Sequence, residues 1–298
     1  MNGASVRRFA LTVAGLVSCL PADDRPPPGI LQTTVSPSPA VRSVTTTADG
    51  WSVSFDRVVV GIGHVSLGDA CASYAEARYG RVIDLAQGAG QKLGTLYGLG
   101  SCDVQFRLEV PASDAVLGQG VSADTLTLMR TPADDAYVSA GGIALLVDGH
   151  ATKGNVEKTF HWRFRQGYHY DTCSAEVGGQ QVSGVTLTGN VTVNYDIEIA
   201  PERLFLDDVS DTAELRFDPF ASADGSSGQA DGEVTLAELG EIDLAQLRGT
   251  APYSVPAPGA GVPVQSLADW VYQVLFPRVP QFRDNGTCIP HVGGGHHH

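Results

Sequence analysis

The chain has 298 residues, of which 43% are hydrophobic and 17% charged, so it is long enough for one large domain or two small ones with a sizeable core. Its formal net charge of −14 repels the phosphates of nucleic acids, and no nucleic-acid partner is expected. The apolar run at residues 9–17 is far shorter than the roughly 20 residues of a membrane-spanning helix, and no other run approaches that length.

The N-terminal segment has the pattern of an export signal. Arg7 and Arg8 precede the short apolar run, and small residues follow it, as in a secretory signal peptide. The adjacent arginines leave a twin-arginine signal as an alternative, and a buried N-terminal strand or helix is another.

Residues 16–19, with the sequence Leu-Val-Ser-Cys, resemble the cleavage site of bacterial lipoproteins. The resemblance implies that residues 1–18 are a signal peptide and that Cys19 becomes the lipidated first residue. Stable anchoring of this kind needs more than one acyl chain. Leu20 stands where some bacterial lipoproteins carry an aspartate that retains them in the inner membrane, so the outer membrane of a bacterial cell envelope is the favoured location.

Four further cysteines follow: Cys71, Cys102, Cys173 and Cys288. An even number of cysteines in an exported protein indicates disulfides. Three pairings are possible, and we expect Cys71–Cys102 and Cys173–Cys288. The absence of a Cys-x-x-Cys spacing disfavours a zinc–cysteine or redox site.

The first half of the chain is predicted to begin with an unstructured segment. Residues 19–48, which include the lipidated cysteine, are rich in proline, serine and threonine and predict a disordered tether. The folded part is expected to begin near Trp51, and residues 71–79 are expected to form a short helical turn. Alternating or continuous apolar residues predict strands at 51–55, 58–60, 81–85 and 102–110.

The rest of the chain continues the same pattern with two helices. Ser122 is placed to cap a short helix that runs to Met129. Ser266 is placed to cap an amphipathic helix near 266–276, and the loop at 250–263 is a connector or a weak domain break. Apolar patterning predicts strands at 143–147, 160–164 and 191–199, with a turn at Asp148-Gly149 after the first.

These elements predict a mainly β protein, with an antiparallel β-sandwich or barrel-like domain over residues 49–290 and a short C-terminal amphipathic helix. No alternation of strands with long helices appears, so a parallel sheet is not expected. Residues 291–298 form a tail of glycine and histidine.

Residues 224–239 carry the most specific chemical signal. Their second part resembles the calcium loop of EF-hand proteins, in which oxygen ligands surround one cation and a glycine reverses the backbone. The matching residues are Asp231, Gly232, Glu233, Thr235 and Glu238, at loop positions 5, 6, 7, 9 and 12.

The first part of the loop departs from that family. Positions 1 and 3 fall on Ser227 and Gln229, where EF-hand loops have acids, and Asp224 substitutes only in an enlarged loop. The resemblance implies a Ca²⁺ site at these residues. The alternative is a degenerate loop that keeps only the turn.

Histidines supply a second set of metal candidates. His291 and the terminal 296–298 are able to bind copper, nickel or zinc, although a glycine spacer before terminal histidines is also typical of a purification tag. His64, His161 and His169 form an internal site if the fold gathers them, and otherwise face solvent.

Recognisable catalytic arrangements are missing from the sequence. No nucleophile elbow, zinc-protease or nucleotide-binding motif appears. The acid pairs Asp134-Asp135 and Asp207-Asp208 are interpreted as solvated turns, because adjacent strand residues point to opposite faces. Arg163 and Arg165 either grip an anion or lie on an exposed sheet face.

Three functional hypotheses follow. The first is a membrane-tethered, non-enzymatic lipoprotein that binds a metal ion, with calcium first, or a protein partner. The second is a structural or assembly lipoprotein without a metal. The third is a periplasmic or surface hydrolase of an unfamiliar type.

Overall fold

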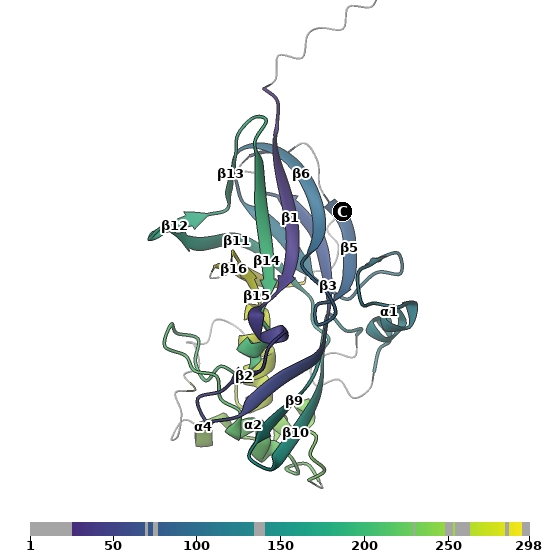
Figure 1. Ribbon diagram of the computed structural model, residues 1–298, viewed down its shortest axis with the longest axis vertical. Helices are drawn as coiled ribbons and strands as arrows, with labels where there is room; N and C mark the ends of the chain where they lie inside the picture. The colour runs from purple at the N-terminus through teal and green to yellow at the C-terminus, as the bar shows by residue number, and fades with distance from the viewer. Residues whose placement is uncertain are drawn as a thin grey trace, which may run out of the picture.

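The computed structural model describes residues 26–68, 71–73, 77–133, 141–228, 230–247, 253, 263–283 and 286–293. Cys19, Gln229, the acid pair at 134–135 and the terminal histidines lie outside these residues. Within them, the strands build two sheets, which give a sandwich-like upper part, and short helices gather below, beside β9 and β10 (Figure 1).

The first sheet has the order β13-β6-β1-β14-β15, and β4 pairs with β6. Most of its pairs are antiparallel, but β1 and β14 run parallel, which the sequence did not indicate. The strands are β1 (Gly29–Pro37), β4 (Ala72–Ser73), β6 (Gln91–Cys102), β13 (Val185–Leu187), β14 (Thr192–Ile199) and β15 (Pro280–Phe282).

The second sheet has the order β10-β9-β3-β7-β11-β12, with β16 on β11, β2 and β5 on β3, and β8 on β5. Its long strand β3 pairs with β9 through its first half and with β7 through its second. The strands are β2 (Thr45–Thr46), β3 (Ser52–Leu67), β5 (Ala77–Asp84), β7 (Val104–Leu108), β8 (Val116–Leu117), β9 (Leu145–Lys153), β10 (Val156–Phe164), β11 (Tyr168–Val177), β12 (Gln180–Ser183) and β16 (Thr287–Val292).

The helices are short, and none of those described is long and apolar enough to cross a membrane. The α-helices are α1 (Ala123–Arg130), α2 (Asp218–Ala223), α3 (Leu236–Gly240), α4 (Leu244–Leu247) and α5 (Leu267–Asp269). A π-helical segment η3 (Trp270–Leu275) continues α5, and the 3₁₀ segments are η1 (Pro39–Val41), η2 (Pro201–Phe205) and η4 (Phe276–Arg278).

One large apolar core runs between the sheets and down to the helices. Its lower part is aromatic: Trp162 lies 5.0 Å from Phe160, 5.5 Å from Phe205 and 5.7 Å from Phe220, measured between ring centres. A smaller core on the opposite face of the second sheet holds Val59, Val82 and Leu146 under Met129 of α1. The consecutive valines at 58–60 are therefore buried on both faces of β3, which explains their continuous apolar run.

The mainly β fold and the C-terminal helical segment confirm the sequence predictions. Ser266 caps α5 with a capping box, and the apolar stripe continues through η3, where Trp270 and Leu275 are fully buried. Ser122 likewise caps α1 by accepting a hydrogen bond from the Thr125 N–H. Pro277 lies inside η4 and continues the helical segment.

Both predicted disulfides are present. Cys71 bonds Cys102 and brings β4 to the end of β6, and Cys173 bonds Cys288 and ties β16 to β11. The expected helical turn at 71–79 is wrong for its described residues. Ala72 and Ser73 form β4 and residues 77–79 begin β5, while residues 74–76 lie outside the described part of the chain.

The predicted tether is wrong from residue 29 onward. Residues 29–37 form β1 in the middle of the first sheet, and η1 and β2 follow. Leu31, Thr33 and Val35 point into the core while Gln32 and Thr34 point outward. The apolar alternation is not evident in the sequence because the buried Thr33 is polar; its hydroxyl donates to the Gly94 carbonyl at 3.2 Å.

Candidate functional site

The EF-hand-like loop lies between α2 and α3 and is attached to the edge strand β10. Thr159 of β10 donates its N–H to the Gly232 carbonyl at 2.8 Å, and the Val234 N–H donates back to the Thr159 carbonyl at 2.8 Å. Gly232 has φ +90°, a left-handed conformation that favours glycine. The Trp162 indole N–H donates to the Val234 carbonyl at 2.9 Å, so the loop is fixed to the aromatic core.

Asp224 closes the start of this loop. Its carboxylate accepts the Asp231 N–H at 3.0 Å and the Gly232 N–H at 3.1 Å, and it forms an ion pair with the Lys158 ammonium. The Lys158 hydrogen bond holds the pKa of Asp224 below its usual range. Because the Asp224 side chain is only 1% exposed, this ammonium is the cation that balances it.

Glu238 closes the end of the loop and is itself 5% exposed. One carboxylate oxygen accepts the Gly225 N–H at 2.9 Å, and the other accepts the Thr235 N–H at 2.9 Å and the Thr235 hydroxyl at 3.0 Å. With the Glu238 N–H donating to the Thr235 hydroxyl oxygen, this is a capping box at the start of α3.

Among the described residues, no contact brings the other loop positions together with the carboxylates of Asp224 and Glu238. Asp231 is exposed and accepts the Glu233 N–H at 2.9 Å, and Ser227 is exposed. Backbone donors and an ammonium therefore occupy the carboxylate oxygens that a calcium ion would need. Within the described parts of the chain, no group of three or more His, Cys, Asp or Glu side chains is arranged to hold a metal ion.

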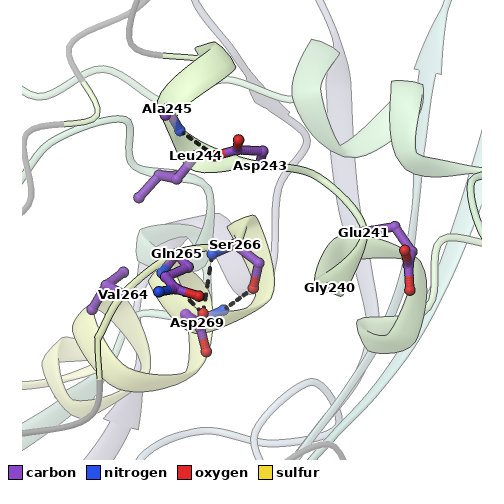
Figure 2. Close-up of a pocket in the computed structure, with 9 residues that line it drawn as sticks. All are labelled: Gly240, Glu241, Asp243, Leu244, Ala245, Val264, Gln265, Ser266 and Asp269. Carbon is purple, nitrogen blue, oxygen red and sulfur yellow. Dashed lines mark hydrogen bonds between the residues drawn. The ribbon is translucent and has the colours of Figure 1, made fainter.

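An open pocket of about 630 Å³ lies directly after this loop, between the α3–α4 connection and the start of α5 (Figure 2). It is lined by Gly240, Glu241, Asp243, Leu244, Ala245, Val264, Gln265, Ser266 and Asp269. The sequence indicates only the capping role of Ser266 here, because the pocket joins two segments, 240–245 and 264–269, that 18 residues of the chain separate.

The carboxylates of the pocket are used as local caps. One Asp269 oxygen accepts the Gln265 and Ser266 N–H groups at 3.0 Å each, and Asp243 accepts the Ala245 N–H at 2.8 Å (Figure 2). The arrangement offers an acidic, open surface.

The four candidate histidines are distributed over three places. His64 Nε2 lies 3.1 Å from Glu109 Oε1, and His161 Nδ1 lies 3.2 Å from Asp148 Oδ1. Only His169 and His291 come together: they are directly opposite in the β11–β16 pairing, with ring centres 6.3 Å apart.

Glu109 is the most perturbed carboxylate of the second sheet. Burial raises its pKa to about 7, and the nearby Arg107 guanidinium opposes that rise. Its partner His64 sits at an irregularity in the β3 pairing with φ +51°. The glycine at position 80 makes room for this carboxylate, since a Cβ there would lie 2.8 Å from Glu109 Oε1.

Asp148 lies inside β9 rather than in the predicted turn. Two arginines pair with its carboxylate on the outer face of the sheet. Arg163 lies 2.6 Å from its Oδ1, and Arg57 lies 3.6 Å from its Oδ2. Arg165 has other partners, because its guanidinium donates to the Thr131 and Gly141 carbonyls at 3.2 and 2.8 Å. Arg163 and Arg165 therefore do not share one anion site.

The structure also corrects the interpretation of Asp207. The sequence predicts a solvated side chain there, but Asp207 is 1% exposed and its Oδ2 pairs with Arg216 Nε at 2.6 Å. Its Oδ1 accepts the Glu214 N–H at 2.9 Å, so this buried acid organises a turn whose other residues are largely exposed.

The residue of this loop site that sequence reasoning missed is Lys158. It belongs to the β9–β10 hairpin, and its separation of 66 residues from Asp224 leaves no local signal. Lys153 of the same hairpin pairs with Asp218 at 2.7 Å, so the two lysines hold the beginning and the end of α2. The rarity of lysine in this chain was the available hint.

No protein-family model matches the chain, and neither a curated protein nor a solved structure matches it.

Proposed function

We propose that the chain is an exported lipoprotein whose β-sandwich is held close to a membrane and acts by binding a protein partner. The observation that carries this proposal is the short interval between Cys19 and the first strand. The sheet begins at Gly29, ten residues after Cys19. Ten extended residues span at most about 35 Å.

Because this interval is short, the end of the first sheet at which β1 begins faces the lipid anchor in this proposal. Gly29 begins β1, and this end of the strand is joined to the turn between β13 and β14, because the Asn190 N–H donates to the Pro28 carbonyl at 3.2 Å and the Ile30 N–H donates to the Val191 carbonyl at 2.8 Å. In the proposed orientation this upper end of Figure 1 faces the membrane, and the helices and the pocket of Figure 2 face away from it.

The two disulfides support an oxidising compartment outside the cytoplasm. A binding rather than catalytic role is supported by the charged groups, since Asp224, Glu238 and Asp207 are each engaged in closing a loop or turn. In this proposal the EF-hand-like loop is structural, with the Lys158 ammonium in the role of the cation.

Calcium binding is the second candidate function. It is favoured by one observation: the loop brings Asp224 and Glu238, two nearly buried carboxylates, to neighbouring positions, because Glu238 accepts the N–H of the residue after Asp224. Binding would require the calcium ion to displace Lys158 and several N–H donors, and the response of the Glu238 variant described in the Discussion separates the two candidates.

The test of the lipoprotein proposal is metabolic labelling of the full chain, produced in a bacterium supplied with a fatty acid that carries a detectable tag. We expect the tag on the wild-type protein and its recovery with membranes. The Cys19→Ser variant should lose the tag and the membrane association while keeping both disulfides, which are outside the signal. An untagged wild-type protein that is exported in soluble form would overturn the proposal.

A further inference from the structure

We propose that His169 and His291 form a two-imidazole site for a divalent transition metal of the zinc, copper or nickel class, on the outer face of the β11–β16 pair. This inference goes beyond the proposed function and does not depend on it. The two residues are directly opposite in an antiparallel pair, so their side chains leave the same face of the sheet. His291 is 53% exposed, which leaves its ring open to solvent.

The spacing of the two rings lies at the linear end of the range for one shared ion, so a tetrahedral zinc ion requires the two side chains to bring their ring centres about 1 Å closer. A metal bound at the usual 2.0–2.1 Å from a ring nitrogen lies about 3.2 Å from the ring centre. Two rings on one metal therefore have their centres about 5.2 Å apart for tetrahedral bonds and about 6.4 Å apart for linear ones. The centres of His169 and His291 are 6.3 Å apart, with the rings inclined by 44°.

Asp171 prepares His291 for this role. It follows His169 by two positions on β11, so it lies on the same face, and its Oδ1 is 3.1 Å from His291 Nε2. A carboxylate that accepts from one ring nitrogen fixes the proton there and leaves the lone pair on the other nitrogen, Nδ1, for a metal. Metal-binding histidines commonly have such a carboxylate partner.

His169 lies between His291 on β16 and Arg107 on β7 in the sheet. Arg107 faces His169 from β7, and its charge opposes a bound cation, so with only two protein ligands we expect micromolar rather than tighter affinity.

The strand pair is also rigid at this place. The disulfide between Cys173 and Cys288 joins β11 to β16 a few residues from both histidines. It keeps β16, which pairs only with β11 among the described strands, in register. A site whose ligands are held in register loses less entropy on binding than one on a free terminal segment.

The experiment is a zinc titration by calorimetry at pH 7.5, using the full chain with His296, His297 and His298 replaced by serine, since those residues would bind metal themselves. We expect one zinc ion per chain with micromolar affinity. His169→Ala and His291→Ala should each weaken binding at least tenfold, and Asp171→Asn should weaken it by about tenfold. His161→Ala is the matched control, a histidine beside an aspartate on another strand, and should bind as the parent does.

Two results would overturn the proposal: no zinc uptake by the parent chain, or uptake that the double variant of His169 and His291 retains. Because His291 is exposed, its substitution leaves the fold intact, and the disulfides provide an independent check on folding. The wild-type lipid tag is unaffected by either result, so failure here is distinguishable from failure of the lipoprotein proposal.

Discussion

Glu238 connects the two ends of the 224–239 loop through a single buried carboxylate. It accepts from Gly225 at the beginning of the loop and from Thr235 at the start of α3. The spacing of Thr235 and Glu238 is common to EF-hand positions 9 and 12 and to a helix capping box, so residue types alone do not distinguish the two. The contacts to backbone N–H groups favour the capping role.

We expect Glu238→Gln to destabilise the protein by about 1–3 kcal/mol. The glutamine amide places its own N–H groups beside a backbone N–H group that donates to the Glu238 carboxylate, and that buried backbone donor then has no acceptor. The measurement is urea unfolding in chelator and again in millimolar calcium. If the loop is structural, the loss is the same in both conditions. Glu241→Gln, an exposed acid three residues on, serves as the control and should change stability by less than about 0.5 kcal/mol.

Calcium that stabilises the wild-type protein, with the gain abolished in Glu238→Gln, would contradict the structural role of the loop and select the calcium candidate instead.

At the scale of elements, β1 determines how the first sheet is assembled. It lies between β6, which pairs antiparallel, and β14, which pairs parallel and comes more than 150 residues later. The segment before Trp51 is therefore part of the folded domain. The β9–β10 hairpin has a comparable role below, because its two lysines hold α2 and, through Asp224, the loop.

The contribution of β1 is measurable with one buried and one exposed neighbour. Leu31 is fully buried, and Leu31→Ala should cost about 2–5 kcal/mol through lost burial and the cavity that remains. Gln32, the next residue, points outward from the same strand, and Gln32→Ala should cost less than about 0.5 kcal/mol. Equal, small effects in chemical denaturation would mean that residues 29–37 behave as a tether after all.

For the whole molecule, the two disulfides constrain loops of very different length. Cys71 and Cys102 are separated by 31 residues, whereas Cys173 and Cys288 are separated by 115. The longer loop contains β14, α2, the EF-hand-like loop and the C-terminal helical segment. Its closure therefore limits the unfolded chain more strongly.

Replacing each pair by alanine should destabilise the protein unequally. Chain-entropy estimates are about 3.7 kcal/mol for Cys71–Cys102 and about 4.8 kcal/mol for Cys173–Cys288. Denaturant unfolding of the two double variants should place the Cys173→Ala, Cys288→Ala protein about 1 kcal/mol below the other. The reverse order would show that strain or local packing, rather than loop closure, dominates.

Several features of this protein were predictable from local pattern. Alternation in residues 104–108 and 160–164 specified strands, because the side-chain period of a strand is read directly from neighbouring residues. Ser122 and Ser266 specified helix starts, since a cap acts within one turn. The cysteine pairing was also anticipated.

Other features depend on residues that meet only in the folded chain. The parallel pairing of β1 with β14, the balance of Asp224 by Lys158, the burial of Asp207 with Arg216 and the meeting of His169 with His291 are examples. Sequence by itself determined the mainly β class, the helix caps and the candidate loop, because those depend on contacts within a few residues. Only the tertiary structure decided what the acids and histidines face, because a charge or a ligand is defined by its partner, and here each partner comes from a different strand or loop.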